Sequence, residues 1–268
     1  MNYFKTIKAI KPKKRLGQNF LINPHIAEFE AEFGKGKIVL EIGPGLGMLT
    51  HALLSHAVKV IAVEKDREMY ALLKHEFSEN EKNLLLINND ILNIETDHIQ
   101  VADIIIANVP YNISSKVLDL IANLKIDAVL CLQKEFVEHM LAKPGTKKYS
   151  KLSVFSQLQF DVRVLKRINA NNFYPVPKVD SSIIYIKFRA EIDKESLNII
   201  SLIMMHKKKT LRNSILDSSQ KLGFDKESTE SFATESIHSR EKVFKLSPVQ
   251  LLEIAKRVKK LQDSTKRI

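Results

Sequence analysis

Residues 108–111 read Asn-Val-Pro-Tyr and directly follow the apolar run 104–107. The exocyclic amine of adenine is a poor nucleophile because its lone pair is delocalised into the ring, and two hydrogen-bond acceptors can redirect that lone pair toward a methyl carbon. The side-chain oxygen of Asn108 and the main-chain carbonyl of Val109 could be these acceptors. Pro110 forces Val109 into an extended conformation, and the Tyr111 ring can stack on the base. The alternative interpretation is an ordinary turn after a strand.

A glycine-rich loop lies between a predicted strand at Lys37–Ile42 and a predicted helix that begins near Met48. Glycines at 43, 45 and 47 permit a tight turn and let a ligand approach the backbone. A dinucleotide site is the alternative, but its third glycine would fall at Met48, and Pro44 lacks an amide hydrogen that a pyrophosphate could use. S-adenosylmethionine has no phosphate, so the loop favours S-adenosylmethionine over a dinucleotide.

Two acidic residues follow the next two predicted strands. Glu64 ends the run 58–63, about 20 residues beyond the glycine loop, where an acid can accept both hydroxyls of a ribose. Asp90 follows the run 84–87 and could accept from the amino group of an adenine, with the backbone N–H of Ile91 donating beside it. Open α/β sheets bind ligands along the edge where the carboxyl ends of parallel strands meet. Gly43, Glu64, Asp90 and Asn108 therefore describe one crevice.

The chain resembles the KsgA/Dim-type small-subunit rRNA adenine dimethyltransferases over nearly its whole length. The resemblance rests on the residues above and on three further segments: 17–21 (Gly-Gln-Asn-Phe-Leu), 173–181 (Phe-Tyr-Pro-Val-Pro-Lys-Val-Asp-Ser) and 207–214 (Lys-Lys-Lys-Thr-Leu-Arg-Asn-Ser). Val109 stands where a Leu is frequent in the family, which matters little if only its carbonyl acts. The resemblance implies dimethylation of two adjacent adenines near the 3′ end of small-subunit rRNA, with a role in small-subunit biogenesis.

The resemblance also implies roles for single residues. Phe173 is expected to sandwich the target adenine opposite Tyr111, and its polar neighbours predict an exposed ring. The expected catalytic residues are Asn108, Val109, Pro110, Tyr111 and Phe173. Together with the loop and the acids, the residues expected to bind S-adenosylmethionine are Asn19, Leu21, Gly43, Gly45, Glu64, Asp90, Ile91 and Asn108. The alternatives are that Asn19 only caps a helix and that Tyr111 belongs to the core.

The order of predicted elements indicates an α/β fold. After a basic arm at 1–16, Asn23-Pro24 begins a helix that ends near Phe33. Strands and helices then alternate to about residue 142, which is typical of a parallel sheet with crossover helices. The segments 152–168 and 182–188 are predicted as strands, and by resemblance they complete a Rossmann-like methyltransferase sheet, mostly parallel with one antiparallel strand. Helical spacing follows, so we expect a catalytic domain at 17–189 and a small helical domain at 190–268.

The net charge is +11, and the basic residues are clustered. Residues 1–15 contain six Lys or Arg and no acid, and two further basic clusters lie at 206–212 and 256–260. Such clusters suit the phosphate backbone of RNA, and we expect the arm to be mobile until RNA orders it. For the cluster at 256–260, a solvated helix face is an equally good explanation.

Composition limits the remaining classes of protein. The single cysteine, Cys131, excludes an internal disulfide, and no Cys/His cluster indicates zinc. We therefore expect a reducing, cytoplasmic location and no metal. No apolar stretch reaches the ~18 residues that span a bilayer, and no segment resembles a signal peptide. We expect a monomer whose partner is small-subunit rRNA in the immature ribosomal subunit.

Three other functions remain open. A large-subunit rRNA adenine methyltransferase of the resistance type shares the fold and a similar tetrapeptide, although 179–181 and 209–213 favour the small-subunit group. A DNA adenine methyltransferase would need a sequence-reading domain that is not visible. A ribosome-assembly or nucleic-acid-binding factor could keep the fold without turnover, but the intact set of Glu64, Asp90 and 108–111 favours retained activity.

Overall fold

The computed structural model describes residues 10–80, 82–223, 231, 233–236 and 238–265. Its strands are β1 (Phe20–Leu21), β2 (Ile38–Ile42), β3 (Lys59–Glu64), β4 (Leu84–Asn88), β5 (Ile104–Asn108), β6 (Asp127–Gln133), β7 (Phe160–Ile168), β8 (Phe173–Tyr174) and β9 (Ser181–Phe188). Its main helices are α2 (Pro24–Ala31), α3 (Met48–His56), α4 (Arg67–Glu76), α5 (Ser114–Leu124), α6 (Lys134–Met140), α7 (Lys151–Gln159), α8 (Lys194–Met205), α9 (Leu211–Leu222) and α11 (Pro248–Thr265).

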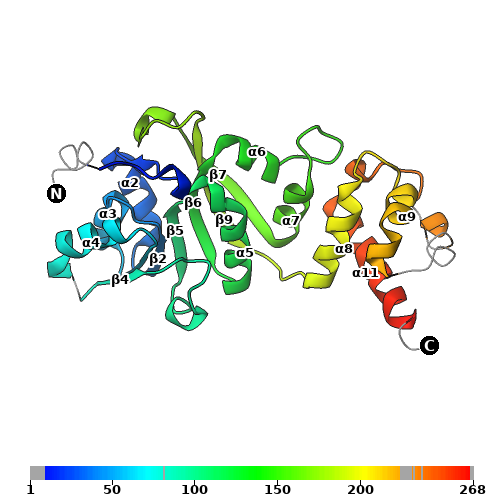
Figure 1. The fold of residues 1–268 in the computed structure, drawn as a ribbon, viewed down its shortest axis with the longest axis horizontal. Helices are drawn as coiled ribbons and strands as arrows, with labels where there is room; N and C mark the ends of the chain where they lie inside the picture. Colours follow the sequence, from blue (N-terminus) through cyan, green and yellow to red (C-terminus); the bar gives the residue numbers. More distant parts are fainter. Residues whose placement is uncertain (1–9, 81, 224–230, 232, 237, 266–268) are drawn as a thin grey trace. The chain divides into compact units, whose positions relative to one another are not determined.

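Seven strands form one sheet in the order β4-β3-β2-β5-β6-β9-β7 (Figure 1). The pairs β2–β3, β2–β5, β3–β4 and β5–β6 are parallel. Strand β9 pairs antiparallel with β6, from Ala128 opposite Ile186 to Gln133 opposite Ser181. The predicted Rossmann-like sheet, mostly parallel with an antiparallel strand, is confirmed. Its order reverses between β2 and β5, the position at which such sheets bind ligands.

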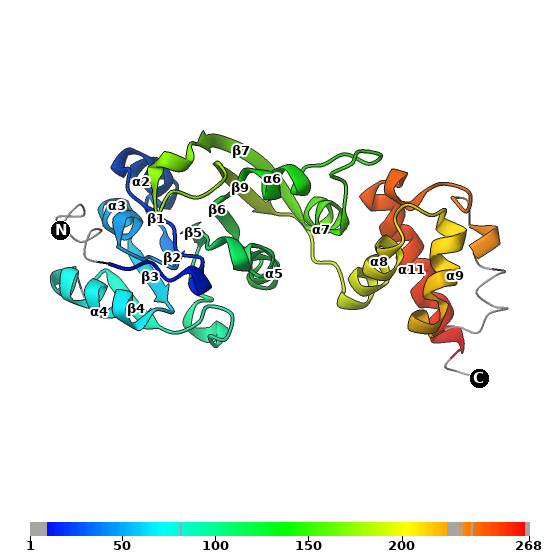
Figure 2. The same ribbon diagram turned by 45° about the horizontal axis from the view of Figure 1, so that its top comes forward.

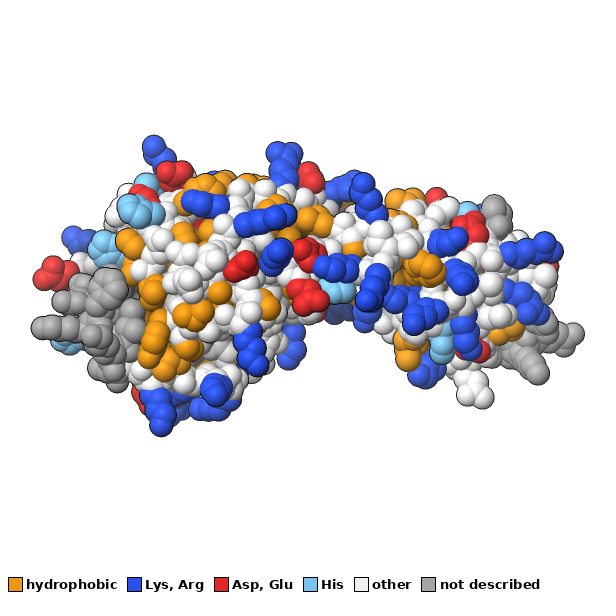
Figure 3. Space-filling view, turned by 90° about the horizontal axis from the view of Figure 1, so that it is seen from above, with side chains coloured by type: hydrophobic (Ala, Val, Ile, Leu, Met, Phe, Trp, Pro, Cys, Tyr) orange, Lys and Arg blue, Asp and Glu red, His pale blue; other side chains and the backbone are white. Residues whose placement is uncertain are grey.

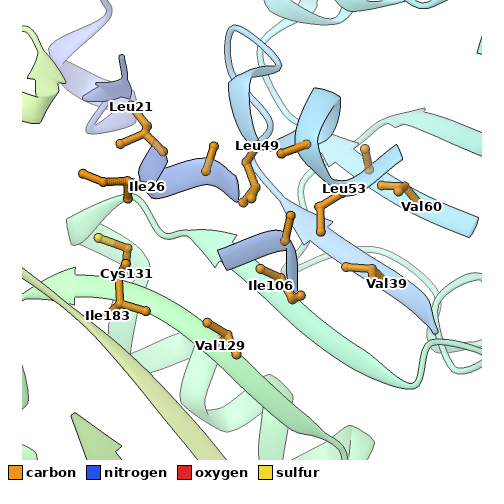
Figure 4. Packing of buried hydrophobic residues seen from close by; sticks show 14 of the residues in the cluster. Leu21, Ile26, Val39, Leu49, Leu53, Val60, Ile106, Val129, Cys131 and Ile183 are labelled. Carbon is orange, nitrogen blue, oxygen red and sulfur yellow. The ribbon is translucent and has the colours of Figure 1, made fainter. Parts of the chain in front are cut away.

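The central strands are continuous apolar runs because both faces of the sheet are covered. On the face covered by α2 and α3, the side chains of Val39, Ile106 and Val129 belong to one buried cluster with Leu49 and Leu53 (Figure 4). The residues adjacent to them along each strand point to the opposite face. The strand ends are thereby fixed between two packed layers, and they carry the polar residues of the site.

Side-chain caps start the two helices that flank the site. Asn23 accepts from the backbone N–H of His25 at 3.0 Å, and the next residue is a proline at the first position of α2. Asp66 caps α4 in the same way, accepting from the N–H of Glu68 at 3.1 Å. The helix predicted at Asn23-Pro24 is confirmed, and it ends at Ala31 before a short turn of 3-10 helix at Glu32–Gly34.

A second, two-stranded sheet joins two segments far apart in the sequence. Strand β1, labelled in Figure 2, pairs antiparallel with β8, with Phe20 opposite Tyr174 and Leu21 opposite Phe173. The N–H of Ile22 extends the contact by donating to the carbonyl of Asn172 at 2.9 Å. This pairing brings together two of the segments on which the family resemblance rests.

One predicted strand is wrong in its first half. Residues Lys151–Gln159 form helix α7, and only Phe160–Ile168 is a strand. Ser150 and Ser153 form a capping box that starts the helix, and the buried Val154 and Leu158 are one helical turn apart. The alternation of apolar residues that predicts a strand is interrupted at Ser156 and is continuous only from Leu158 to Val164.

The chain divides into two compact units, one holding residues up to 137 together with 161–188, and the other holding 138–160 together with 189–268. The second unit is helical, and its core includes Leu158 of α7, Ile200 of α8, Leu211 of α9 and Leu251 of α11. The bounds predicted from the sequence, 17–189 and 190–268, differ from this division in residues 138–160, because α7 packs into the helical core.

Residues 1–9 of the basic arm lie outside the described residues. In the remainder of the arm, Ile10 packs against a small cluster that includes Phe20 and Met69. Lys13 Nζ donates to Asp66 Oδ1 at 2.7 Å. Residues 10–16 therefore contact the sheet unit, and the expectation of a mobile arm stays a prediction. Among the described helices, none combines the length and the apolar character needed to cross a bilayer.

Candidate active site

A cavity of about 340 Å³ lies at the carboxyl ends of β2, β3, β4 and β5. Its lining contains almost every residue that the sequence predicts for the site, namely Asn19, Gly43, Gly45, Glu64, Asp90, Ile91, Asn108, Val109, Pro110, Tyr111 and Phe173. Leu21 is the exception: its side chain belongs to the buried cluster beneath α2 and lines a smaller neighbouring pocket. All these residues lie in the sheet unit.

The glycine loop uses its amide hydrogens within the protein. The N–H groups of Gly43, Gly45 and Gly47 donate to Val63 O at 2.9 Å, Glu64 Oε2 at 3.0 Å and Pro44 O at 2.9 Å. The backbone of Gly45 has a φ of +59°, and a Cβ there would lie 2.8 Å from the Phe20 ring. Because the amides of its three glycines are used within the protein and an acid lies beside it, the loop is a poor site for phosphate. It fits a cofactor that has no phosphate.

Glu64 is held almost entirely by backbone amides. Its Oε2 accepts from Gly45, and its Oε1 accepts from the N–H of Asp66 at 2.7 Å. Burial raises the pKa of the Glu64 carboxyl, and these two hydrogen bonds oppose that rise. Each oxygen keeps a further lone pair, so the carboxyl can accept the two hydroxyls of a ribose.

Asp90 lies at the next strand end and is paired with a residue that the sequence reasoning missed. Lys65 Nζ donates to its Oδ2 at 2.7 Å, and the N–H of Leu92 donates to its Oδ1 at 3.1 Å. Burial acts to raise the pKa of Asp90, but the hydrogen bonds from Lys65 and Leu92 and the charges of Lys65 and Lys116 together outweigh it, and the pKa is lowered. Asp90 is therefore an ionised acceptor on the cavity wall, beside the predicted Ile91.

Asn108 lies on the cavity wall, and its side-chain oxygen is not used within the described part of the chain. Its Nδ2 donates to Glu30 Oε2 at 3.0 Å, while its Oδ1 is buried and has no hydrogen-bond partner among the described residues. A buried carbonyl oxygen without a partner is uncommon. An amine placed in the cavity would satisfy it.

The rest of the tetrapeptide is fixed by local contacts. The N–H of Val109 donates to the carbonyl of Cys131 at 3.3 Å, which ties the turn to β6. Pro110 has φ −55° and ψ 127° and begins a 3-10 turn at Tyr111–Ile113. The Tyr111 hydroxyl and Ser181 Oγ are 2.9 Å apart. Burial raises the pKa of Tyr111, so the ring is neutral and its position is set by Ser181.

The exposed setting predicted for Phe173 is wrong. Its side chain is only 3% exposed, because β8 pairs with β1 and draws the ring into the cluster beneath α2. Phe173 and Tyr111 both line the cavity. The two aromatic residues therefore belong to one site, although they come from distant segments.

Glu30 is the main residue that sequence reasoning missed. The buried stripe of α2 consists of Ile26, Ala27, Glu30 and Ala31, so a charged residue occupies a core position. That break in the apolar pattern is a signal that the sequence offers. Glu30 lies behind the cavity wall, whereas Lys65, Lys116 and Cys131 line the cavity itself and were not predicted to do so.

Comparison with known proteins agrees with this geometry. Residues 9–260 match the family described as ribosomal RNA adenine dimethylase. The chain belongs to this family. A probable ribosomal RNA small subunit methyltransferase A from Thermococcus gammatolerans is 37% identical over 251 residues, which cover 91% of this chain and 88% of the relative. Its counterpart from Methanopyrus kandleri is 40% identical and covers 84% of each chain.

One solved structure supports the same assignment, and a second shows the shared fold. A dimethyladenosine transferase from Plasmodium falciparum superposes with a TM-score of 0.76 at 28% identity, over 90% of this chain and 98% of that one. The 23S rRNA methyltransferase ErmE gives a TM-score of 0.60 at 24% identity, which shows the shared fold alone. The predicted family is confirmed, and the chain is an S-adenosylmethionine-dependent rRNA adenine methyltransferase.

Proposed function

We propose that this family member dimethylates the exocyclic amines of two adjacent adenines near the 3′ end of small-subunit rRNA, acting as a monomer on the immature subunit. The observation that carries the proposal is the buried Asn108 Oδ1, which has no partner among the described residues and lies on the cavity beside Val109. An adenine amine has two hydrogens and requires two acceptors. The Asn108 oxygen and the Val109 carbonyl meet that requirement.

We assign the cofactor to the part of the cavity lined by Gly43, Gly45, Glu64, Asp90 and Ile91. Glu64 would accept the ribose hydroxyls, and Asp90 with the N–H of Ile91 would bind the adenine of the cofactor. Asn19, directly before β1, and Leu21, within β1, would frame this end of the site. When bound, S-adenosylmethionine supplies a methyl group on a positively charged sulfur, for which the acidic wall is electrostatically suited.

The chain's own residues then orient the amine. Tyr111 would stack on one face of the flipped adenine, at ~1–3 kcal/mol, which offsets part of the few kcal/mol that unstacking costs. Phe173 would cover the other face only after its ring leaves the buried cluster. Asn108 and Val109 hold the amine with its lone pair toward the methyl group. The proton leaves for solvent after the nitrogen has gained its new bond, so no basic side chain is needed. Catalysis is mostly positioning.

Basic side chains of the helical unit would supply affinity for RNA, and Figure 3 shows Lys and Arg side chains over much of its visible surface. They are not equivalent. Lys259 pairs with Asp193 at 2.9 Å and with Glu195 at 3.0 Å, so part of the cluster at 256–260 is neutralised within the unit. Lys207 donates to the carbonyl of Tyr149 at 2.5 Å. The exposed Lys208 is better placed for a phosphate.

The proposal is tested by following label from methyl-labelled S-adenosylmethionine. The protein is incubated with immature small subunits, large subunits, naked small-subunit rRNA and duplex DNA, and the modified base is mapped. We expect two methyl groups on each of two adjacent adenines near the 3′ end of the small-subunit rRNA. Methyl label on large subunits or on DNA would show that the enzyme modifies a different nucleic acid from the one proposed. Absence of transfer with normal cofactor binding would favour an assembly factor.

A further inference from the structure

Glu30 is a buried acid directly behind the proposed catalytic amide. It lies on α2, its side chain is fully buried, and its Oε2 accepts from Asn108 Nδ2 at 3.0 Å. Its other oxygen, Oε1, is buried and has no partner among the described residues. Neither the tetrapeptide nor the cofactor loop accounts for an acid at this place.

An apolar residue at position 30 would serve the fold better. The neighbours of Glu30 in the buried stripe of α2 are Ile26, Ala27 and Ala31. Burying a carboxyl with one oxygen unpaired costs stability. Since Asn108 is the hydrogen-bonding partner of this carboxyl, a role in holding Asn108 explains the acid and a role in the core does not.

The two ends of an asparagine amide are nearly the same in shape but opposite in hydrogen bonding. If the amide turned over, Nδ2 would face the target amine, and a donor would meet a donor. An ionised carboxylate can only accept, so it binds Nδ2 and rejects Oδ1. We propose that Glu30 is a positioning residue that selects the productive orientation of the Asn108 amide, an inference that rests on the proposed function.

The surroundings of Glu30 determine when this selection operates. The titratable groups that interact electrostatically with it are Glu41 on β2 and Cys131 on β6. On the exposed side of α2, Glu28 pairs with His56 at 2.5 Å, and Lys166 of β7 lies over the Phe29 ring. Burial raises the pKa of Glu30 to about 8. A protonated Glu30 could donate a hydrogen bond as well as accept one, and it would then bind either orientation of the Asn108 amide. The selection of one orientation therefore strengthens as the pH rises and Glu30 ionises. A positively charged cofactor nearby also favours the ionised form.

The test compares Glu30→Gln with Glu28→Gln, the same change on the exposed side of the same helix. Gln keeps the size of Glu but can donate as well as accept, so it no longer selects one amide orientation. We expect kcat of Glu30→Gln to fall about tenfold, as for the loss of one charge-assisted hydrogen bond. The KM for RNA and the Kd for S-adenosylmethionine should stay within about twofold of wild type, within the scatter expected for a remote substitution. We expect Glu28→Gln to behave as wild type.

A measurement that needs no turnover separates this inference from the proposed function. With ¹⁵N-asparagine labelling, the side-chain amide signals of Asn108 are assigned by their loss in Asn108→Ser and followed between pH 6 and pH 9. In the wild-type protein they should shift as Glu30 ionises, and in Glu30→Gln they should be independent of pH. Unchanged kcat in Glu30→Gln, or Asn108 signals that do not respond to Glu30, would overturn the inference. Failure of the wild type to methylate rRNA, with the amide signals as expected, would overturn only the proposed function.

Discussion

The two ends of the cavity are held in place by different parts of the chain. At the cofactor end, Glu64 is bound by the backbone amides of Gly45 and Asp66, which belong to the same strand–loop–strand region. At the base end, Asn108 is bound by the side chain of Glu30, from a helix far away in the sequence. Tyr111 likewise depends on the Ser181 hydroxyl. One end relies on main-chain groups that every sequence supplies, and the other relies on particular side chains.

This difference predicts two kinds of mutational effect. Changes at the cofactor end should alter the affinity for S-adenosylmethionine and leave the rate of a saturated complex nearly intact. Changes at the base end should lower kcat while both substrates still bind. If substitutions at both ends changed kcat and cofactor affinity in the same way, the proposed difference between the two ends would be wrong.

The largest effect is expected for Asn108→Ala. Loss of one of two acceptors aimed at the reacting amine should lower kcat by about 10²–10³-fold, the range found when one preorganised polar group is removed from an active site. RNA affinity should be unchanged, because binding depends mainly on phosphate contacts. Single-turnover methyl transfer and RNA binding are measured alongside Asn123→Ala, a change on the exposed surface of α5. Retained turnover in Asn108→Ala would rule out the proposed role of the Asn108 oxygen in orienting the amine.

The next largest effect is expected for Glu64→Ala, at the opposite end. The substitution removes the proposed ribose acceptor and leaves the N–H groups of Gly45 and Asp66 without their carboxylate partner. Because a hydrogen bond to a charged group contributes about 1.5–3 kcal/mol, the Kd for S-adenosylmethionine should rise about 100-fold. Calorimetric titration measures the Kd, and the rate is then measured at saturating cofactor. A large loss of kcat at saturation, with little change in Kd, would contradict the comparison.

The same difference explains how much of the site could be predicted. Glu64 and Asp90 could be assigned because each directly follows an apolar strand, and parallel strands bring their ends to one edge. Glu30 could not be assigned to the site, because only the three-dimensional structure shows that α2 brings it to Asn108 at the end of β5. Its sole signal is a charge in an apolar helical stripe.

The fold shows a similar limit. The existence of strands 38–42, 59–64, 84–88 and 104–108 follows from their short apolar runs, which α3, α4 and a turn of 3-10 helix separate. Helix α7 was wrongly predicted as strand, since Val154 and Leu158 fit both helical spacing and alternation, and the capping serines decide in favour of the helix. The burial of Phe173 depends on pairing between β1 and β8, which no local pattern indicates.

A smaller effect is expected for Gly45→Ala, and Gly36→Ala is its matched control. Both glycines have positive φ, +59° and +70°, so both substitutions introduce backbone strain of roughly 1–2 kcal/mol. At Gly36 a new Cβ meets nothing within 4 Å, whereas at Gly45 it would lie 2.8 Å from the Phe20 ring. Gly45→Ala should therefore be less stable than Gly36→Ala by about 1–2 kcal/mol and should bind cofactor less tightly. Urea unfolding measures the stability of both variants. Equal stabilities would mean that the packing of Phe20 on the loop is not tight.

The smallest effect is expected in the pH dependence of stability. It tests whether the buried acid at the base end lowers the stability of the fold when it ionises. Burial raises the pKa of both Glu30 and Glu41 to about 8, from 4.5 in the unfolded chain. The folded protein thus holds protons that the unfolded chain has lost, and the stability that these protonated groups contribute is complete below about pH 4.5 and disappears as the pH rises through 8. Between pH 7 and pH 8, each group should lower the free energy of unfolding by about 1 kcal/mol. Glu30→Gln should abolish the part of this pH dependence that Glu30 contributes, and Glu28→Gln should leave the pH dependence unchanged. If both variants keep the wild-type slope in urea unfolding at pH 6, 7, 8 and 9, Glu30 does not titrate in this range, and the pH-dependent shift expected of the Asn108 amide signals would be wrong as well.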